Sequence, residues 1–360
     1  MENLKDEILE LLEFKRISEL KTTLQDINAA DVAALIAELP EEHLPIIFRI
    51  LPKETAADAF AYLDGDIQEL LITAFSDKEL KEVIDNLFLD DTVDLIEEMP
   101  ANVVSRILRQ TPPEKRKKIN EVLNYPKDSA GSIMTIEYVD LKRNMTVQDA
   151  FARIRRTGIN KETIYTCYVT NEQRELIGIV TVKTLLLSDY SEIIEDIMDS
   201  NPISVTTFED KEQVARHFDK YDFLALPVVD TENRLVGIIT VDDAMDVLQD
   251  ENTEDIEMMA AITPTDKPYM KTGVIETWKK RIPWLLLLMI SATFTGKIIQ
   301  HYELALGTYV VLTAFIPMLM DTGGNAGGQA SVTIIRGLSL GEIEYRDVPK
   351  IVWKELLVAL

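Results

Sequence analysis

The sequence has little of the chemistry that disulfides, soft metals and nucleic acids require. Its 360 residues contain one cysteine, Cys167, which excludes a disulfide framework within the chain and a cysteine-based zinc site. The three histidines are far apart in sequence and have no metal-ligand spacing. Basic side chains number 37 against 62 acidic ones, which gives a net charge of −25. Such a surface repels phosphate backbones, so a nucleic-acid partner is disfavoured.

Recognisable catalytic patterns are missing as well. The sequence offers no Ser/His/Asp or Cys/His constellation and no phosphate-cradling glycine loop before a helix. What it has in excess is carboxylate, the ligand type of hard cations such as Mg²⁺ and Ca²⁺. An enzyme is therefore the least expected class, and an acidic surface that concentrates cations is favoured.

Residues 1–130 are predicted to form an all-α domain. Apolar residues recur at helical spacing, and prolines mark the expected helix starts. The segments DVAALIAELP (31–40) and DTVDLIEEMP (91–100) form an internal repeat. Repeated multi-helix units of this kind stack into a superhelical array, which is typical of an interaction or regulatory domain. The charged N-terminus lacks the apolar core of a signal peptide, so we expect this domain to stay in the cytoplasm.

A second internal repeat fills residues 131–250. ELIGIVTVKTLL (175–186) aligns with RLVGIITVDDAM (234–245), and each copy alternates short apolar strands with helices in the order βαββα. The two copies, 131–190 and 191–250, resemble a tandem cystathionine-β-synthase (CBS) domain. This resemblance implies a regulatory module whose cleft often holds an adenosine nucleotide, here near Tyr168 and Phe223.

The segment from Asp242 to Glu257 has no basic residue. Its eight acids are Asp242, Asp243, Asp246, Asp250, Glu251, Glu254, Asp255 and Glu257. Read as a helix, positions 243, 246, 250, 254 and 257 share one face, where like charges repel each other until a counter-ion binds. The alternative is a solvated acidic linker, since charge runs are usually of that kind.

A second acidic group lies in the N-terminal domain. Asp90, Asp91 and Asp94 are predicted to close one helix there, and Asp58 lies in an earlier helix. Alone, Asp90 or Asp91 is a better candidate for a helix N-cap than for a metal ligand. Facing the acidic segment across a domain interface, however, these carboxylates could be bridged by divalent ions, and without the ions they would repel it.

Two apolar runs near the C-terminus, 284–299 and 304–320, predict a membrane hairpin. The basic residues that flank it are Lys271, Lys279, Lys280 and Arg281 before the first run and Arg336, Arg346 and Lys350 after the second, which places both flanks in the cytoplasm. The alternative is that each run is a buried core helix. A third apolar segment opens at Ile351.

A glycine-rich segment follows the second apolar run. Gly323, Gly324, Gly327 and Gly328 are predicted to interrupt the helix at membrane depth, where irregular backbone is tolerated mainly around a water-filled cavity. The neutral oxygens of Asn325, Gln329, Ser331 and Thr333 suit a hydrated magnesium ion. The alternative is close helix packing through small residues.

Taken in order, these segments resemble the MgtE family of magnesium channels and transporters over essentially the whole chain. The specific motifs are Tyr221-Asp222-Phe223 with LPVVD (226–230), VGIITVDD (236–243), TEDI (253–256) and TGGNAGGQ (322–329). The resemblance implies a homodimer in the inner membrane of the cell, multi-pass, with its N-terminal and CBS domains in the cytoplasm. It also implies Mg²⁺ ions that hold the cytoplasmic domains in a closed state.

Matched motif by motif, the family implies a set of metal ligands in this chain. They are Asp243, Asp246, Glu251, Glu254 and Asp255 on the connecting helix and its approach, Asp222 and Glu212 in the second CBS repeat, and Asp58, Asp90 and Asp94 in the N-terminal domain. Asn325, Gly324 and Gly328 would line the pore, and Asp321 stands where the family usually has a small residue. Beyond the CBS repeats, residues 251–280 are expected to form an acidic connecting helix, and residues 281–360 the first two membrane helices and the start of a third.

The function predicted is magnesium uptake gated by cytosolic magnesium, with the interdomain carboxylates as the sensor that closes the pore. The expected partners are divalent cations, membrane lipid and a second copy of the chain. The alternative is an adenine-nucleotide-sensing regulator, which would bind ATP in the CBS cleft and use the hairpin as a membrane anchor.

Overall fold

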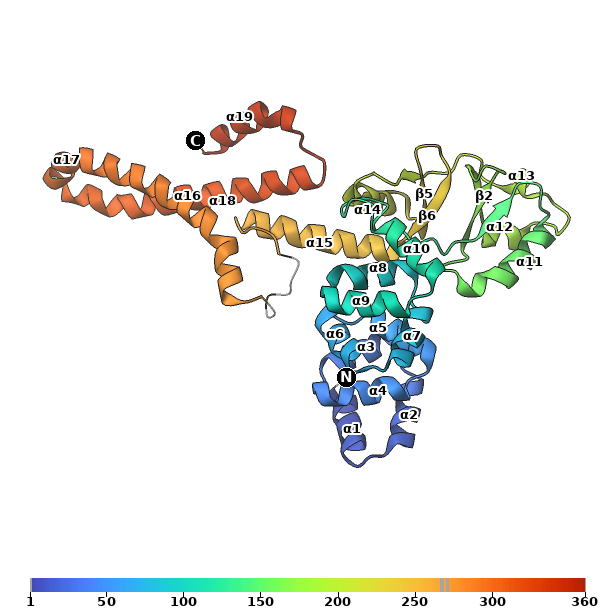
Figure 1. Ribbon diagram of the computed structural model, residues 1–360. Helices are drawn as coiled ribbons and strands as arrows, with labels where there is room; N and C mark the ends of the chain where they lie inside the picture. The colour runs from blue at the N-terminus through green and yellow to red at the C-terminus, as the bar shows by residue number, and fades with distance from the viewer. Residues whose placement is uncertain (1, 266–268, 270–271, 360) are drawn as a thin grey trace. The chain divides into compact units, whose positions relative to one another are not determined.

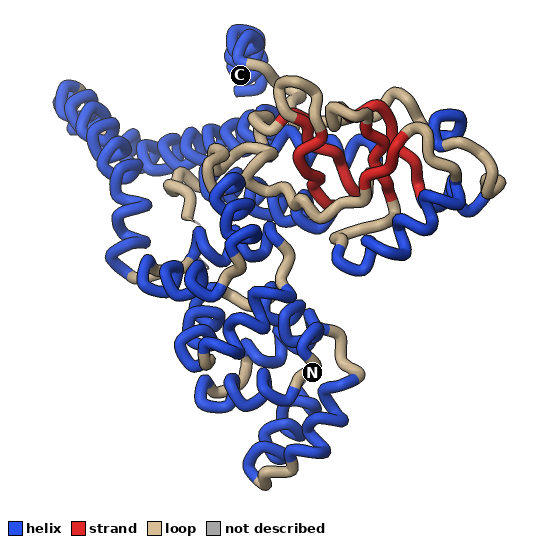
Figure 2. Tube along the Cα trace, turned by 45° about the vertical axis from the view of Figure 1, so that its right-hand side comes forward, coloured by secondary structure: helices blue, strands red, loops and turns tan. Residues whose placement is uncertain are grey.

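The computed structural model describes residues 2–265, 269 and 272–359 (Figure 1). The chain forms two compact units, Met1–Ala244 and Met245–Leu360. Strands occur only in the CBS part of the described residues, and the remaining regular structure is helical (Figure 2). The fold class expected from the sequence is therefore confirmed: a helical N-terminal domain, two small mixed α/β repeats, a long connecting helix and helical segments after it.

From residue 2 onward, where the structure describes the chain, the N-terminal domain contains ten α-helices. They are α1 (Glu2–Glu13), α2 (Ile17–Gln25), α3 (Ala29–Ala37), α4 (Leu44–Ile50), α5 (Lys53–Ala61), α6 (Gly65–Ala74), α7 (Asp77–Asn86), α8 (Leu89–Glu98), α9 (Ala101–Gln110) and α10 (Pro113–Val122). Pro52, Pro100 and Pro112 occupy the N-cap positions of α5, α9 and α10. Proline is tolerated there because the first helical N–H groups have no partner inside the helix.

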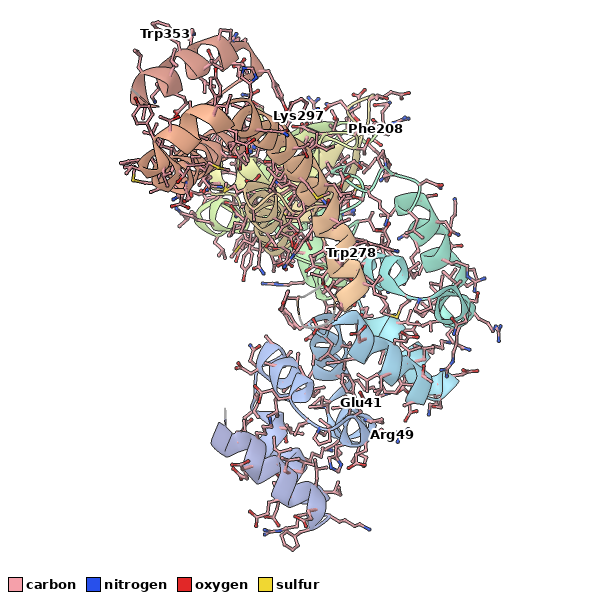
Figure 3. All side chains as sticks on the ribbon, turned by 90° about the vertical axis from the view of Figure 1, so that its left-hand side faces the viewer. Glu41, Arg49, Phe208, Trp278, Lys297 and Trp353 are labelled. Carbon is pink, nitrogen blue, oxygen red and sulfur yellow. The ribbon has the colours of Figure 1, made fainter. Side chains whose placement is uncertain are left out.

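Aromatic packing and side-chain hydrogen bonds connect successive helices of this domain. Phe48 packs against Phe60 and Phe75, with ring centroids 6.2 and 5.8 Å apart. Lys115 of α10 donates from Nζ to the carbonyl oxygens of Ile84 and Leu87, at 2.7 and 2.6 Å. A basic side chain in this position satisfies carbonyls that the end of α7 leaves open. On the surface, Arg49 of α4, labelled in Figure 3, pairs with Glu79 of α7 at 2.8 Å.

Each CBS repeat has the predicted βαββα order. The first contains β1 (Asp140–Lys142), α11 (Val147–Thr157), β2 (Thr166–Thr170), β3 (Leu176–Thr181) and α12 (Val182–Leu187), and the second contains β4 (Val205–Thr206), α14 (Lys211–Tyr221), β5 (Ala225–Val229), β6 (Leu235–Thr240) and α15 (Val241–Met259). A short helix, α13 (Ile194–Ile197), lies between them. In each sheet, of order β1-β2-β3 and β4-β5-β6, the first pair of strands is parallel and the second antiparallel.

Gly178 in β3 and Gly237 in β6 allow the backbone of a neighbouring segment to lie close to these strands. A Cβ atom on Gly237 would lie 2.7 Å from the carbonyl oxygen of Thr135, and one on Gly178 would lie 2.8 Å from that of Asp199. Thr135 pairs with Ile238 in an antiparallel bridge, and Asp199 pairs with Ile179 in the same way. The glycines therefore fix the linker before each repeat against a strand of the other repeat.

The second unit contains the rest of α15, then α16 (Val274–His301), α17 (Glu303–Thr308), α18 (Phe315–Ser339) and α19 (Val348–Ala359). Trp278, labelled in Figure 3, lies on α16. Within the described residues, α16 is the one helix long and apolar enough to cross a membrane. The predicted two-helix hairpin is thus wrong in its second half, because residues 304–320 divide among α17, a 3-10 turn at Val310–Ala314 and α18.

Pro317 is one feature that disfavours a single helix over that run, although α16 accommodates Pro283 in its interior. Pro317 falls in the first turn of α18, where its missing N–H costs nothing. Had the helix continued from residue 304, the same ring would have clashed with the carbonyl group four residues earlier. The connecting helix also differs from the prediction of 251–280, because α15 begins at Val241 and ends at Met259. Part of that range, Lys271 included, lies outside the described residues.

The glycine-rich segment is helical, which contradicts the predicted interruption. Gly323, Gly324, Gly327 and Gly328 all lie inside α18, and none of the four has a positive φ. Polar neighbours bond within the helix: Thr322 Oγ1 donates to the carbonyl oxygen of Met318 at 2.8 Å. Each glycine costs only about 1 kcal/mol relative to alanine in a helix, so the cooperative run of backbone hydrogen bonds outweighs it.

Candidate functional site

The acidic cluster consists of carboxylates from the N-terminal domain and the CBS repeats within the first unit. Its members are Asp90, Asp91 and Asp94 on α8, Glu162 in the loop before β2, and Asp242 and Asp243 at the start of α15. The aspartates of α8 were expected to close a helix, but Asp90 and Asp91 lie in its first turn and Phe88 is its N-cap. The prediction that Asp90 or Asp91 is a helix N-cap is therefore wrong. Asp90 is 8% exposed.

Burial, and then repulsion between neighbouring carboxylates, raises the pKa of Asp90, Asp91, Asp94, Glu162 and Asp243. For Asp90 the pKa is well above its usual range because of burial and then the charge of Asp243. Burial also raises the pKa of Asp243 to about 7, although Thr240 opposes this by donating from Oγ1 at 2.6 Å. The pKa of Asp94 rises to about 7, through desolvation first and then Asp243 and Asp91. Because the Asp94 side chain is partly open to water, solvent screening tempers this effect.

Within the cluster, Glu162 has the environment that most clearly disfavours a negative charge. Burial, followed by the charges of Asp91 and Asp243, raises its pKa to about 8. Its Oε2 atom is buried and has no hydrogen-bond partner. A buried carboxylate oxygen without a donor costs free energy unless it is protonated or contacts a cation. The cluster therefore concentrates negative charge, and a bound cation would lower the free-energy cost of holding these carboxylates together.

A basic side chain of the chain lies near the cluster without neutralising it. Lys115 interacts electrostatically with Asp90 and Asp91, but its ammonium group donates to the carbonyl oxygens of Ile84 and Leu87. Burial lowers the pKa of Lys115 more than these acids raise it. Among the described residues, no three Asp, Glu, His or Cys side chains form a closed metal-ligand set. An ion held here would have to keep part of its water shell, as Mg²⁺ usually does.

Of the residues implied by family resemblance, four belong to this neighbourhood. Asp90, Asp94 and Asp243 are members of the cluster, and the charge of Asp58 on α5 contributes to the raised pKa of Asp91. Burial and the nearby Glu54 raise the pKa of Asp58 itself.

Two of the implied ligands, Glu212 and Asp222, have other surroundings. The carboxylate of Glu212 forms an ion pair with Arg216 on the same helix, α14. Asp222 caps the C-terminal end of α14 with a left-handed backbone (φ 54°) and lines the CBS cleft described below. Sequence reasoning missed Glu162, since it lies in a loop and only the fold brings it to α8.

The other implied ligands lie farther along α15, in the second unit. They are Asp246, Glu251, Glu254 and Asp255. Asp255 is 3.8 Å from Arg336 of α18, and Arg336 also donates from Nη1 to Asn252 Oδ1 at 3.2 Å. Here the guanidinium group of Arg336 partly balances the acidic face of α15.

The residues implied for the pore lie on α18. Gly324, Asn325 and Gly328 are all exposed, and the side-chain amide of Asn325 donates to Asp321 Oδ2 at 3.2 Å. A Cβ atom added to either glycine would meet no neighbour within 4 Å among the described residues. The helix therefore presents a stripe of small residues with one polar pair beside it.

A separate apolar cleft opens within the CBS pair. It has a volume of about 740 Å³, and its lining includes Tyr165, Tyr168, Lys183, Asp222 and Phe223. Tyr168 is fully buried, and its hydroxyl oxygen has no hydrogen-bond partner. A cavity of this size with aromatic walls and a few polar groups suits a small organic ligand. The unpartnered hydroxyl is a group that such a ligand would satisfy.

Comparison with known protein families accounts for most of the chain. Residues 27–128 match the MgtE intracellular N domain, residues 130–189 and 194–250 match the CBS domain, and residues 316–360 match a divalent cation transporter family. Together with the fold, these matches define a transport protein that contains a pair of CBS domains, not an enzyme.

Individual relatives make the assignment specific. The chain is 35% identical to the magnesium transporter MgtE of Thermus thermophilus over 95% of its own length and 76% of the relative's. It is 32% identical to MgtE of Bacillus subtilis, over 98% and 78% of the two lengths. The chain belongs to the MgtE family of magnesium transporters.

Solved structures of relatives agree with the fold. A crystal structure of the cytosolic domain of the Mg²⁺ channel MgtE in complex with ATP matches 68% of this chain and 99% of its own, with a TM-score of 0.64 and 34% identity. The soluble part of a magnesium transporter matches 70% and 99%, with a TM-score of 0.65 and 29% identity.

Proposed function

We propose that the chain is a magnesium-gated magnesium channel whose acidic cluster senses the cytosolic ion. At high magnesium, hydrated ions lie among Asp90, Asp94, Glu162 and Asp243 and hold α8 against the start of α15, which closes the pore. At low magnesium, the carboxylates repel one another and release the contact. The single observation that carries this proposal is the buried, unpartnered Oε2 of Glu162 beside Asp90 and Asp243, whose pKa values are raised as well.

The affinity required is modest. A sensor of millimolar free magnesium needs a binding free energy of roughly 4 kcal/mol per site. Bridging through water, with few direct protein ligands, is consistent with so weak a site. The ion shifts a population only by binding the closed form better than the open one. In the closed form the six carboxylates of the acidic cluster lie close together and can share an ion. If α8 separated from α15, the carboxylates would be divided between the two parts, and the ion would bind less well.

The remaining parts of the proposal follow from family membership. We propose a homodimer in the inner membrane with several spans, of which α16 is the first, and with the N-terminal and CBS domains in the cytoplasm. Asp246, Glu251, Glu254 and Asp255 would extend the sensing surface along α15, with Asp58, Glu212 and Asp222 as further ligands. Asn325, Gly324 and Gly328 would line the cytoplasmic mouth of the pore on α18.

A second ligand is supported by the CBS cleft. We propose that it binds an adenine nucleotide, with the base between aromatic side chains such as Tyr168 and Phe223 and with Lys183 facing the phosphates. The unpartnered hydroxyl of Tyr168 supports this, and so does the ATP bound to the cytosolic domain of a relative. Such a ligand would be a modulator beside magnesium, rather than the only signal.

Limited proteolysis with and without magnesium tests the sensor. We expect magnesium to protect the α8 and 158–165 segments of the parent chain and to protect the Asp243→Asn variant far less. Asp219→Asn, an exposed carboxylate on α14, is the matched control and should behave as the parent does. Equal protection of the two variants would show that the acidic cluster is not where magnesium acts. With the complete membrane domain, uptake by Asp243→Asn should continue at magnesium concentrations that close the parent.

A further inference from the structure

A small polar pocket lies beside β1, apart from the CBS cleft and from the acidic cluster. Its volume is about 270 Å³, and its lining residues are Ile136, Tyr138, Asp140, Lys161, Thr170 and Arg174. It shares no lining residue with the cleft. The chain carries a net charge of −25, yet the lining of this pocket has two basic residues, Lys161 and Arg174, and one acidic residue, Asp140.

The one acidic residue of the lining is already neutralised. Asp140 forms an ion pair with Arg153 of α11, and Arg153 also donates from Nε to the backbone carbonyl of Asp140 at 2.6 Å. Glu137, the other carboxylate close by, accepts a hydrogen bond from Thr135 Oγ1 at 2.7 Å. Neither carboxylate forms an ion pair with Lys161 or Arg174. Both carboxylates nevertheless act on Lys161 through space: burial lowers the pKa of Lys161, and the charges of Glu137 and then Asp140 oppose this.

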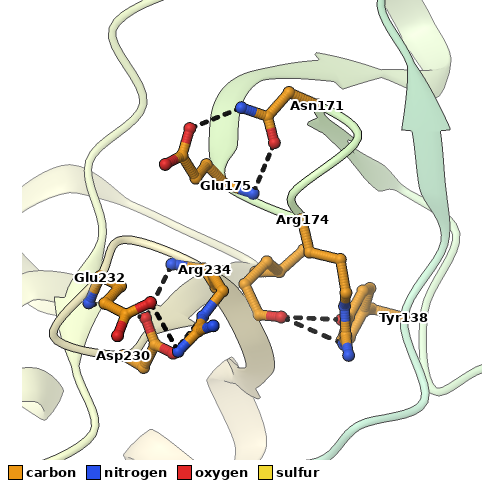
Figure 4. Close-up of polar contacts among 8 residues, drawn as sticks. Tyr138, Asn171, Arg174, Glu175, Asp230, Glu232 and Arg234 are labelled. Carbon is orange, nitrogen blue, oxygen red and sulfur yellow. Dashed lines mark hydrogen bonds and ion pairs between the residues drawn. The ribbon is translucent and has the colours of Figure 1, made fainter.

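The hydrogen-bond donors of the pocket are unused. Lys161 has no side-chain hydrogen bond and no ion pair among the described residues. Arg174 reaches Tyr138 Oη and the carbonyl oxygen of Leu235 only at 3.4 Å each, from a single nitrogen, Nη2 (Figure 4). A distance of 3.4 Å is beyond the usual range for N–H···O bonds. The guanidinium group can therefore turn its remaining N–H groups to a ligand.

Thr170 supplies a third donor of fixed direction. Its Oγ1 accepts a hydrogen bond from Lys142 Nζ at 3.0 Å, and Lys142 also donates to the carbonyl oxygen of Asn171 at 2.9 Å. With its oxygen serving as the acceptor, the hydroxyl hydrogen of Thr170 remains to be donated. The Thr170 side chain is 3% exposed, so burial holds it in place.

We propose that this pocket binds a phosphate-class oxyanion. Two positively charged groups and one hydroxyl face a cavity that holds a tetrahedral anion with some of its water. Two cationic side chains in one small pocket favour an anion, and a phosphate group carries about −1.5 to −2 near pH 7. Charge-assisted bonds from guanidinium and ammonium groups are the strong ones in such sites. Free inorganic phosphate and the phosphoryl group of a nucleotide share this chemistry.

Protection of Lys161 from acetylation tests the pocket in the full chain. The chain in detergent is treated with a limiting amine acetylating reagent at fixed magnesium and ionic strength, with inorganic phosphate, ATP or chloride, and the lysines are followed by mass spectrometry. We expect saturable protection of Lys161 by phosphate, while Lys117, which lies on the surface of α10, reacts equally in all three. Protection by ATP alone would support the pocket and identify a nucleotide as the source.

Two variants assign the protection to this pocket. Arg174→Asn is chosen because asparagine tolerates the positive φ of 67° at this position. Thr170→Val removes the hydroxyl group without changing the shape of the side chain. Loss of one charge-assisted donor should raise the half-protecting concentration by about 10-fold or more. Thr170→Val should give a smaller increase, and it keeps the test available if Arg174→Asn folds poorly.

A control in the cleft separates the two anion sites. Lys183→Ala should leave the protection of Lys161 intact. If Lys183→Ala abolished the protection, the anion would bind in the CBS cleft and the inference would be wrong. Equal protection by chloride, or an unchanged half-protecting concentration in both Arg174→Asn and Thr170→Val, would overturn it as well.

Discussion

Removal of the Glu162 charge should stabilise the metal-free chain, and the effect should depend on pH in a defined direction. The pKa of Glu162 rises from an ordinary 4.5 to about 8, because of burial first and then the charges of Asp91 and Asp243. The folded state therefore binds a proton that the unfolded state releases. Below about pH 4.5 both states are protonated and the group has no effect. As pH rises from there to 8, stability falls, and above 8 the loss is complete.

The magnitude follows from the same two values. A difference of one pKa unit corresponds to about 1.4 kcal/mol, so ionised Glu162 costs up to ~3 kcal/mol at pH 7 and ~5 kcal/mol above pH 8. Neighbouring carboxylates share the same protons, so a fraction of this, about 2 kcal/mol, is the expected gain for Glu162→Gln at pH 8. Glutamine keeps the shape of the side chain and removes the charge.

Hydrogen exchange of the α8 amides in chelator measures this gain. We expect exchange in Glu162→Gln to be about 30-fold slower than in the parent at pH 8, which corresponds to about 2 kcal/mol, and nearly unchanged at pH 5. Glu172→Gln, in the exposed turn between β2 and β3, is the matched control and should match the parent at both pH values. Magnesium should slow exchange in the parent at pH 8 more than in Glu162→Gln. If the two variants exchanged alike at pH 8, the electrostatic account of the cluster would be refuted.

Three further outcomes are expected. Tyr168→Phe removes the buried hydroxyl without a partner, so the nucleotide-free chain should be as stable as the parent or up to about 1 kcal/mol more stable. Calorimetry should at the same time show weaker ATP binding; unchanged binding would exclude this hydroxyl as a contact. Gly237→Ala places a Cβ 2.7 Å from the Thr135 carbonyl oxygen and should lower the free energy of unfolding by about 2 kcal/mol, whereas Gly273→Ala, with no neighbour within 4 Å, should not. Arg336→Gln breaks the contact with Asp255, an exposed pair worth at most about 1 kcal/mol, so cross-linking between α15 and α18 should fall only in part; complete loss would mean that Arg336 does more than pair.

Local patterns in the sequence predicted most of the first unit. Helical spacing and proline positions indicated the N-terminal helices, because a proline ring suits a helix start and little else there. The repeated segments at 175–186 and 234–245 indicated two βαββα repeats, and both repeats have that order of elements in the structure. These features depend on residues that are close together in the chain, so they can be predicted from a single sequence.

Features that depend on distant residues were not predictable in the same way. Glu162 joins the acidic cluster only because the loop before β2 folds back beside α8, and nothing in its own neighbourhood signals that. The glycines of α18 were misread because their individual helix costs are small beside the cooperativity of a 25-residue helix. The second apolar run was misread because its composition suits a membrane span, whereas the structure divides it between α17 and α18, with Pro317 in the first turn of α18.

The junction of β6 and α15 has a mechanical consequence. Thr240 ends the strand and Val241 begins the helix, so no loop between them can absorb a rotation. From Asp243 to Asp255 the helix rises by about 18 Å, and a tilt of roughly 10° at its start would carry its far part sideways by about 3 Å. In a continuous helix, the displacement caused by a small angular change at the first turn grows in proportion to the distance along the helix.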